Sequence, residues 1–329
     1  MFNREEISQN DLNQATNIIN AISDYYGERI VGQQNLKLSL LVSLIANGHI
    51  LLESVPGLAK TTAAKVLTSA VGGSFSRIQC TPDLLPSDIL GTQTFNYQNS
   101  NFETKIGPIN ANFVLLDEIN RSSAKTQSAM LEAMQERQIT IGGENYKLPP
   151  VFIVIATQNP IEQEGTYPLP EAQLDRFLIK EILDYPTPQE EMEVLNRIES
   201  NIINDNRQVI KLEAITYLQE LCKKVYVDNN IKKYISLIVN ATRYPEKYID
   251  KELAKYISCG ASTRACIAFM ESSKALALMN GRNYVTPNDI KELKYSILRH
   301  RIQLNFSAIA DDVKTEEIID AIFGAVKTP

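Results

Sequence analysis

The stretch "HILLESVPGLAKTT" (residues 49–62) joins a short apolar run to a turn that contains Gly57 and ends in Lys60 and Thr61. A buried strand, a glycine-containing turn and a Lys-Thr pair that opens a helix are the parts of a phosphate-binding loop. In such a loop, consecutive backbone N–H groups point at the phosphates, and the dipole of the following helix also favours anions. The stretch therefore predicts a nucleotide site at the end of a strand.

Two positions of this loop differ from the pattern G-x-x-x-x-G-K-[ST], because Ser54 and Ala59 stand where glycines are usual. Ala59 is small, and it fits the loop if its φ angle is negative. Ser54 is harder to fit, although it lies at the exit of the strand rather than against the phosphates. On the loop alone, an ordinary strand–turn–helix connection with a surface lysine remains an alternative.

A second apolar run, "FVLLDEIN" (113–120), places Asp117 and Glu118 directly after four apolar residues. A nucleoside triphosphatase uses one carboxylate to hold Mg²⁺ and a second one to polarise the attacking water. Alternation along the strand puts the two side chains on different sides of its end, so that they can take different roles. We expect Asp117 and the Thr61 hydroxyl to bind Mg²⁺, Glu118 to polarise the water, and Lys60 to contact the β- and γ-phosphates.

A third apolar run, "VFIVIATQN" (151–159), ends in the polar residues Thr157 and Asn159. Short strands of this kind alternate with helical stretches, which predicts an α/β fold of three layers around a mostly parallel sheet. Residues 92–106 and 138–148 have the pattern of two β-hairpins around the turns "QNSN" and "GGEN". The expected helices of this part are 5–28, 33–47 and 61–71.

The pattern changes after "DYPTP" (184–188), because nearly every later segment has the periodicity of an amphipathic helix. The chain of 329 residues is also long for a single core. We therefore expect an α/β nucleotide-binding domain at 1–187 and an all-α domain at 188–329. The helices expected in the second domain are 210–227, 231–243, 263–280 and 287–300.

Composition argues against several classes of function. A net charge of −6 disfavours nucleic acid as the main partner, since nucleic-acid-binding surfaces are basic. The four cysteines have no C-x-x-C spacing and the chain has two histidines, so we expect neither a zinc site nor disulfides. The polar start of the chain is unlike a signal peptide, and no apolar run approaches the ~20 residues of a membrane span. These features predict a cytoplasmic protein.

Six blocks of the sequence resemble AAA+ ATPases, and the MoxR family in particular. The resemblance spans essentially the whole chain, and its blocks occur in the order and spacing of that family. Alanine is common before the lysine in this family, so Ala59 conforms, whereas Ser54 departs from the usual glycine and puts tight phosphate binding or turnover in question. The blocks are "VGQ" (31–33), "VPGLAKT" (55–61), "LLDEINR" (115–121), "ATQNP" (156–160), "LPEAQLDRF" (169–177) and "GASTRA" (260–265).

In this resemblance the loop matches the Walker A motif and the acidic pair matches the Walker B motif. The resemblance also implies roles for two further polar residues. Asn159 matches the sensor 1 residue, which orients the attacking water; a capping role before Pro160 is the alternative. Arg176 matches the arginine finger, which reaches the γ-phosphate of a neighbouring subunit. The alternative for Arg176 is a surface ion pair with Asp175 or Glu171, which would contribute little.

Arg264 matches the sensor 2 residue, which contacts the nucleotide from the helical lid. Ser262 and Thr263 have the pattern of a helix N-cap, which places Arg264 in the first turn, where a cation opposes the helix dipole by ~0.3–1 kcal/mol. A bound phosphate would offset that cost, and nothing within "GASTRA" would. The expected nucleotide-binding residues are Val31, Gly32, Val55, Pro56, Gly57, Leu58, Ala59, Lys60, Thr61, Thr62, Asp117 and Arg264. The residues expected to act in hydrolysis are Lys60, Glu118, Asn159 and Arg176.

For function, the resemblance implies Mg²⁺-dependent hydrolysis of ATP to ADP at the subunit boundaries of a homo-oligomeric ring, with a hexamer as the expected ring. A hinge at 184–188 would turn hydrolysis into chaperone-like remodelling of a protein client, or into maturation by cofactor or metal insertion. A protein with a von Willebrand factor A domain is the expected partner. The two hairpins resemble the helix-2 insert and the pre-sensor-1 hairpin of the clade that includes magnesium chelatase, where they face the partner or the pore. Decoration of the sheet is their alternative.

Two other functions stay open at this point. The first is a nucleotide-switched scaffold whose turnover is weakened by Ser54, although the intact Asp117, Glu118 and Arg176 argue against it. The second is a nucleic-acid motor, which the acidic balance of the chain disfavours.

Overall fold

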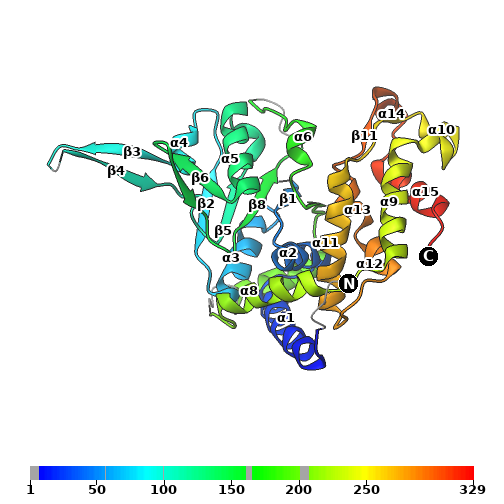
Figure 1. The fold of residues 1–329 in the computed structure, drawn as a ribbon, viewed down its shortest axis with the longest axis horizontal. Coiled ribbons are helices and arrows are strands. Elements are labelled where there is room, and N and C mark those ends of the chain that lie inside the picture. Colours follow the sequence, from blue (N-terminus) through cyan, green and yellow to red (C-terminus); the bar gives the residue numbers. More distant parts are fainter. Residues whose placement is uncertain (1–6, 56, 99, 161–164, 201–206) are drawn as a thin grey trace.

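The computed structural model describes residues 7–55, 57–98, 100–160, 165–200 and 207–329. Its centre is a five-stranded sheet in the order β2-β5-β8-β1-β9, in which every pair of neighbours is parallel (Figure 1). The strands are β1 (Ile50–Glu53), β2 (Phe75–Gln79), β5 (Phe113–Asp117), β8 (Ile153–Gln158) and β9 (Ile179–Ile182). The predicted α/β fold with a parallel sheet is therefore confirmed.

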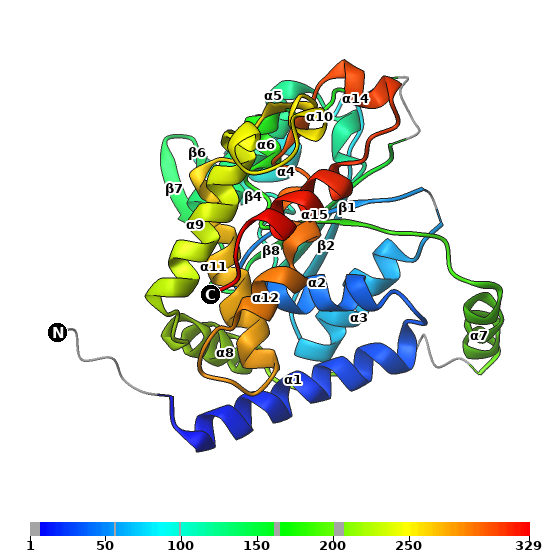
Figure 2. The ribbon, with the colours of Figure 1, turned by 90° about the vertical axis from the view of Figure 1, so that its right-hand side faces the viewer.

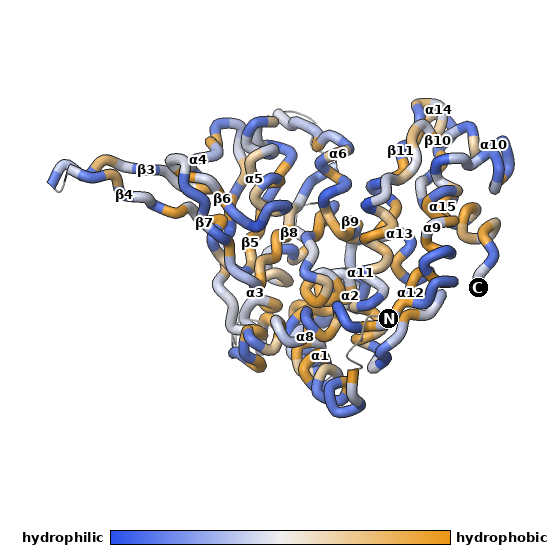
Figure 3. Tube along the Cα trace, in the orientation of Figure 1, coloured by the Kyte–Doolittle hydropathy of each residue, from blue (hydrophilic) through white to orange (hydrophobic). Residues whose placement is uncertain are grey.

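Both faces of the central strands β1, β5 and β8 are buried, and successive residues of such a strand enter two different cores. Ile50, Phe113 and Ile153 pack in the cluster that contains α1 (Gln9–Arg29), α2 (Gln34–Ile45) and α3 (Lys60–Val71). Leu51 and Val114 pack in the second cluster, with α4 (Pro86–Leu90) and α5 (Ala124–Glu136). This arrangement explains the continuous apolar runs, because a parallel strand covered by helices on both sides has no solvent-facing side. The hydropathy colouring of Figure 3 shows these strands and helices as the apolar interior.

Both predicted hairpins are present. β3 (Gly91–Asn96) pairs with β4 (Asn101–Ile106), and β6 (Gln138–Ile141) pairs with β7 (Glu144–Lys147). The β3–β4 hairpin projects from the body at the left of Figure 1 and carries three exposed aromatic rings in edge contact, from Phe95, Tyr97 and Phe102. In the second hairpin, Gly142 and Gly143 both have positive φ angles (59° and 86°), as a two-residue turn between twisted strands requires.

The chain after the sheet is almost entirely helical, as predicted, apart from one short pair of strands. The expected helix 287–300 is divided at Leu293 into two short helices. The helices are α6 (Glu171–Leu174), α7 (Pro188–Glu199), α8 (Leu212–Lys224), α9 (Asn229–Arg243), α10 (Lys251–Ala254), α11 (Thr263–Met279), α12 (Pro287–Glu292), α13 (Lys294–Leu298), α14 (Phe306–Ala310) and α15 (Thr315–Ala325), and the strands are β10 (Ile257–Cys259) and β11 (Gln303–Leu304). Among the residues that the structure describes, 3-10 turns lie at Ile119–Arg121 and Pro245–Lys247. Among the described residues, no helix is both long and apolar enough to cross a membrane.

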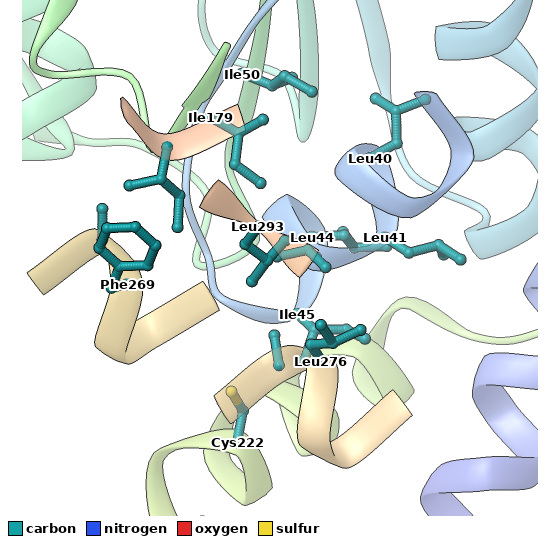
Figure 4. Packing of buried hydrophobic residues seen from close by; sticks show 14 of the residues in the cluster. Leu40, Leu41, Leu44, Ile45, Ile50, Ile179, Cys222, Phe269, Leu276 and Leu293 are labelled. Carbon is teal, nitrogen blue, oxygen red and sulfur yellow. The ribbon is translucent and has the colours of Figure 1, made fainter. Parts of the chain in front are cut away.

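The helices from α8 onward share one hydrophobic core with the sheet. Figure 4 shows Ile45 of α2 beside Leu276 of α11, with Cys222 of α8 below them, in a cluster that also contains Leu41 of α2 and Ile179 of β9. Helix α7 differs, because none of its residues is buried and it stands apart from the body in Figure 2. A change of backbone angles at 184–188 would therefore displace α7 without opening that shared core.

Both histidines are buried in hydrogen-bonded positions that suit the neutral ring. The Nδ1 atom of His49 accepts from the backbone N–H of Val154, and its Nε2 atom donates to the carbonyl of Met134, both at 3.0 Å. The Nε2 atom of His300 donates to the carbonyl of Phe177 at 3.2 Å. Burial, with smaller contributions from nearby arginines, lowers the pKa of His49 to about 3 and the pKa of His300 well below its ordinary value.

We predict that the protein loses stability as the pH falls from 6.5 to 5. In this range the histidines of the unfolded chain, with a pKa near 6.5, take up protons that the folded protein excludes. Stability from each histidine is therefore fully present above pH 6.5 and is lost toward the folded-state pKa, at about 1.4 kcal/mol per pH unit. Denaturant unfolding at several pH values measures the slope. The His49→Gln variant should be less stable at pH 7.5 but should lose about half of the slope, and a wild-type slope near zero would contradict the prediction.

Candidate functional site

Three of the four residues expected to act in hydrolysis, Lys60, Glu118 and Asn159, lie at one edge of the sheet. Strands β5, β8 and β1 are neighbours, with Leu116 opposite Ala156 and Leu52 opposite Thr157. Because the strands are parallel, their carboxyl ends meet at the same edge, which is where ligands bind in open α/β sheets. The structure thereby brings the glycine-containing loop, the acidic pair and the end of β8 together. Asn159, which is buried, follows β8 directly at this edge.

The loop after β1 accommodates Ser54 without a left-handed backbone, since Ser54 is not among the residues with positive φ. Its side chain is buried, and its hydroxyl donates to the carbonyl of Val55 at 2.9 Å. Its backbone N–H extends the pairing with β8 by donating to Gln158 at 3.2 Å. The Nζ atom of Lys60 folds back over the loop and lies 3.4 Å from the carbonyl oxygen of Ser54.

The condition on which Ala59 is expected to fit the loop, a negative φ angle, is not met. Ala59 has a φ of 51° and a ψ of 19°, in the left-handed region, and it is the residue from which α3 starts. An L-residue there costs about 1–2 kcal/mol, because its Cβ approaches the following carbonyl oxygen. The geometry lets α3 begin directly at Lys60, so that the first N–H groups of the helix lie beside the loop. Gly57 also has a positive φ of 89°, and Pro56 lies outside the described residues.

The acidic pair is held by one buried hydroxyl. The Oγ1 atom of Thr157 donates to Oδ1 of Asp117 at 2.8 Å and accepts from the backbone N–H of Glu118 at 2.9 Å. Glu118 lies just past the strand, in the left-handed region at φ 57°. Thr157 therefore fixes the carboxylate of Asp117 and the backbone of Glu118 relative to each other.

Two residues of β2 complete this arrangement. Arg77 donates from Nε to Oδ2 of Asp117 at 3.2 Å, and the two side chains form an ion pair. Gln79 donates to Oε2 of Glu118 at 2.8 Å, and Arg121 donates to the same oxygen at 3.2 Å. Sequence reasoning missed Arg77 and Gln79, because the pairing of β2 with β5 follows from the strand order, which no local pattern reveals.

A cavity of about 580 Å³ lies beside the loop. Its size falls within the usual range for sites that bind small molecules. Val31 lines the cavity together with Gly57, Leu58, Ala59 and Thr62 of the loop and its helix, so the structure joins these expected nucleotide contacts. The opposite wall comes from α7 and consists of Val194, Leu195 and Ile198. The sequence did not indicate this contribution of α7.

Gly32 does not line the cavity but is required beside it. Its φ is 62°, and a Cβ atom built there would lie 2.2 Å from Oε1 of Glu190 at the start of α7. A side chain at this position would therefore push aside the carboxylate of Glu190, which caps the start of α7 through Thr187, and would also strain the backbone.

The structure places Arg176 and Arg264 at the other end of β1. Both line a second cavity of about 350 Å³, together with residues 46–49, which precede β1. The four residues of β1 span about 13 Å and the loop lies beyond them, so neither arginine lies at the phosphate loop of its own chain. Arg137 and Arg301 also line this second cavity, which gives it four arginines.

The local contacts of Arg176 and Arg264 bear on the alternatives that the sequence left open. Arg176 forms no ion pair with Asp175 or Glu171 among the described residues; its Nη1 atom donates to the carbonyl of Leu131 at 3.2 Å. Ser262 caps α11 as expected, with its hydroxyl accepting from the N–H of Arg264 at 3.0 Å. Asp175 lies 3.9 Å from Nη1 of Arg264, so a carboxylate distant in sequence offsets part of the dipole cost.

Comparison with known proteins identifies close relatives. The model of the ATPase family associated with various cellular activities (AAA) matches residues 49–179, and that of the AAA lid domain matches residues 250–322. The chain is 45% identical to Chaperone MoxR1 of Mycobacterium tuberculosis over 300 residues, which cover 91% of this chain and 79% of that protein. It is 44% identical to the uncharacterized protein YeaC of Bacillus subtilis over 301 residues, 91% of each chain. A crystal structure of a candidate ATPase from Cytophaga hutchinsonii matches with a TM-score of 0.91 at 45% identity over 97% of both chains.

We predict opposite effects of glycine at the two unusual loop positions. Ala59→Gly removes the Cβ that opposes a left-handed backbone, and it should raise the free energy of unfolding by about 0.5–1 kcal/mol after the entropic cost of glycine. Ser54→Gly removes a buried, bonded side chain from a residue with ordinary angles, and it should lower that free energy by about 1 kcal/mol. Denaturant unfolding of both variants measures the difference. An equal effect of the two substitutions would contradict this assignment of strain.

Proposed function

The chain belongs to the MoxR family of AAA+ ATPases, and on that premise we propose that it hydrolyses ATP at the boundaries between subunits to remodel a protein client. The enzyme is an ATP hydrolase by its family. The observation that carries the proposal is the distribution of charged groups. The loop and the carboxylates lie at the carboxyl edge of the sheet, and the arginines line a cavity at the amino end of β1.

The residues at the carboxyl edge fit Mg²⁺ and a nucleotide. The cavity beside the loop has apolar walls for a base, and Lys60 projects over the loop, where it would contact the β- and γ-phosphates. Thr61 and Asp117 supply the hydroxyl and carboxylate oxygens that Mg²⁺ prefers. When bound, Mg²⁺ would neutralise charge that develops on the phosphate oxygens. Arg77 pairs with Asp117 and supplies a positive charge next to this carboxylate in the structure, so it would have to move aside for the metal.

Glu118 is the general base of the proposed mechanism. Its carboxylate would accept a proton from the attacking water, while Asn159 would orient that water. Thr157 holds the backbone N–H of Glu118 and the carboxylate of Asp117, so the backbone that carries the base keeps a fixed position relative to the metal ligand. Ser54 is accommodated without strain, which favours turnover over a scaffold that only switches with nucleotide.

Arg176 and Arg264 would act on the nucleotide of the adjacent subunit. A protomer that carries its loop at one end of β1 and these arginines at the other is suited to head-to-tail contacts, which generate rings where the rotation between subunits closes. We propose a ring of subunits, with six as the number expected of this family. Neither arginine needs to reach its own loop in such a ring.

The proposed work is chaperone-like and takes place in the cytoplasm. Chaperone MoxR1 is a relative by sequence, which supports a protein client. Maturation of that client by cofactor or metal insertion, and a partner with a von Willebrand factor A domain, are the finer proposals. We propose 1–187 and 188–329 as the two functional units, with α7 as the part that moves at 184–188.

We predict that Glu118→Gln abolishes turnover but keeps nucleotide binding. The amide preserves the shape of the side chain and cannot accept a proton, so the ATPase rate should fall by roughly 100-fold or more. Steady-state ATPase assays give the rate, and equilibrium binding of Mg·ATP gives the affinity. Glu220→Gln, which changes an exposed carboxylate of α8, is the matched control and should keep full activity. Turnover by Glu118→Gln at the wild-type rate would refute the role of the base.

We predict that the defects of Arg176→Ala and Arg264→Ala are rescued by mixing with Lys60→Ala protein. The Lys60→Ala subunit has an impaired loop and intact arginines, so in a mixed ring it can complete the site of a neighbour. ATPase activity of the mixture should exceed the sum of the separate activities, and it should rise with total protein concentration. If Arg264 served its own nucleotide, Arg264→Ala would stay inactive at every mixing ratio while Arg176→Ala recovered.

A further inference from the structure

Arg301, which lines the second cavity with Arg176 and Arg264, makes several hydrogen bonds. Its side chain is 2% exposed, and each of its three nitrogens donates. Nε donates to Oδ1 of Asp175 at 2.8 Å. Nη2 donates to the carbonyls of Phe177 at 2.6 Å and Asp175 at 3.3 Å, and Nη1 donates to the carbonyls of Leu178 at 3.2 Å and Ile297 at 2.6 Å. The guanidinium therefore bonds to the backbone carbonyls of Asp175 and Phe177, the residues on either side of Arg176.

Asp175, the partner of Arg301, also holds the start of α11. Its Oδ2 atom accepts from the hydroxyl of Ser262 at 2.6 Å and lies 3.9 Å from Nη1 of Arg264. Ser262 is the N-cap of α11, so Asp175 is bonded to the residue that fixes where this helix begins. One carboxylate thus joins the segment of Arg176, the segment of Arg264 and the buried Arg301.

Burial of this ion pair calls for an explanation beyond stability. Taking two charges out of water costs about as much as their attraction returns, and apolar residues of similar volume often stabilise a protein as well. The pair instead fixes the geometry of its acceptors. A planar guanidinium holds several acceptors at set angles, which a lysine cannot do. The acceptors fixed here are the carbonyls next to Arg176.

We propose that Arg301 and Asp175 are positioning residues that hold Arg176 and Arg264 as one rigid unit for the adjacent subunit. The inference rests on the proposed action of these two arginines across the boundary. Arg301 touches no nucleotide in this scheme, and it acts through the backbone of 175–178 and through the N-cap of α11. Its effect therefore belongs to the subunit that donates the arginines, not to the subunit that holds the nucleotide.

This asymmetry defines the experiment. Arg301→Lys, which keeps the charge and loses the planar fork, is introduced separately into Lys60→Ala (the donor) and into Arg176→Ala (the acceptor). In the donor, the substitution should lower the rescued ATPase rate roughly 10–100-fold through misplaced arginines, with little change in KM. In the acceptor, it should leave the rescued rate unchanged, because that subunit contributes no arginine finger.

Arg299→Lys in the donor is the matched control. Arg299 is also an arginine of this segment, with 12% of its side chain exposed, but it pairs with Glu181 and Glu316 rather than with 175–178. Rescue by this donor should remain at the level of Lys60→Ala alone. Thermal melting and Mg·ATP binding of each protein, together with co-elution of the mixed rings, report on folding and assembly.

Three results would overturn the proposal: full rescue by the Arg301→Lys donor, an equal loss when the substitution is in the acceptor, or failure of the Arg301→Lys donor to enter mixed rings. Failure of Lys60→Ala itself to rescue Arg176→Ala can be told apart from these three results, because rescue would then be absent without any substitution at Arg301. That result would refute the shared site on which this inference rests, and the inference with it.

Discussion

Burial of both faces of the central strands β5, β8 and β1 governs what the rest of the molecule can do. A parallel strand covered by helices on both sides can offer polar groups only at its ends, because a charged side chain within the layers would lose its hydration. The three central strands, β5, β8 and β1, accordingly carry apolar residues along most of their length, and Asp117, Thr157 and the loop after Glu53 come where these strands stop. The chemistry of the site is thus confined to one edge by the packing of the core.

The same constraint separates the two kinds of charge. The carboxyl ends of the strands hold the acidic pair, and the amino end of β1 holds a cavity with four arginines. A single chain cannot bring the two ends of one strand together. The helices from α8 onward cannot bend round to bridge them either, because they share a hydrophobic core with α2 and β9. A second copy is the simplest means of joining them.

The sequence predicted those parts of the structure whose signal is local. The apolar runs identified the buried strands, the turn residues identified both hairpins, and the Ser-Thr pair before Arg264 identified the start of α11. Features that depend on strand order or on contacts between distant parts of the chain could not be predicted from the sequence. Arg77 and Gln79 become relevant only because β2 lies next to β5, and Asp175 meets Arg301 across 126 positions of the chain. The left-handed angle of Ala59 was missed because alanine gives no sign of it.

Helix α7 is held in place by few contacts. Its apolar residues Met192, Leu195 and Ile198 are more than half exposed, and it is joined to the body through polar bonds such as that from Arg197 to the carbonyl of Gly27 at 2.7 Å. A segment with so little buried surface opens and closes independently of the global unfolding of the protein. In the proposed complex, a purine ring would fill the cavity against Leu195 and Ile198 and give α7 the hydrophobic core that the protein alone does not provide. The nucleotide would then count among the structural components of the fold, and slow amide hydrogen exchange in α7 would record its presence.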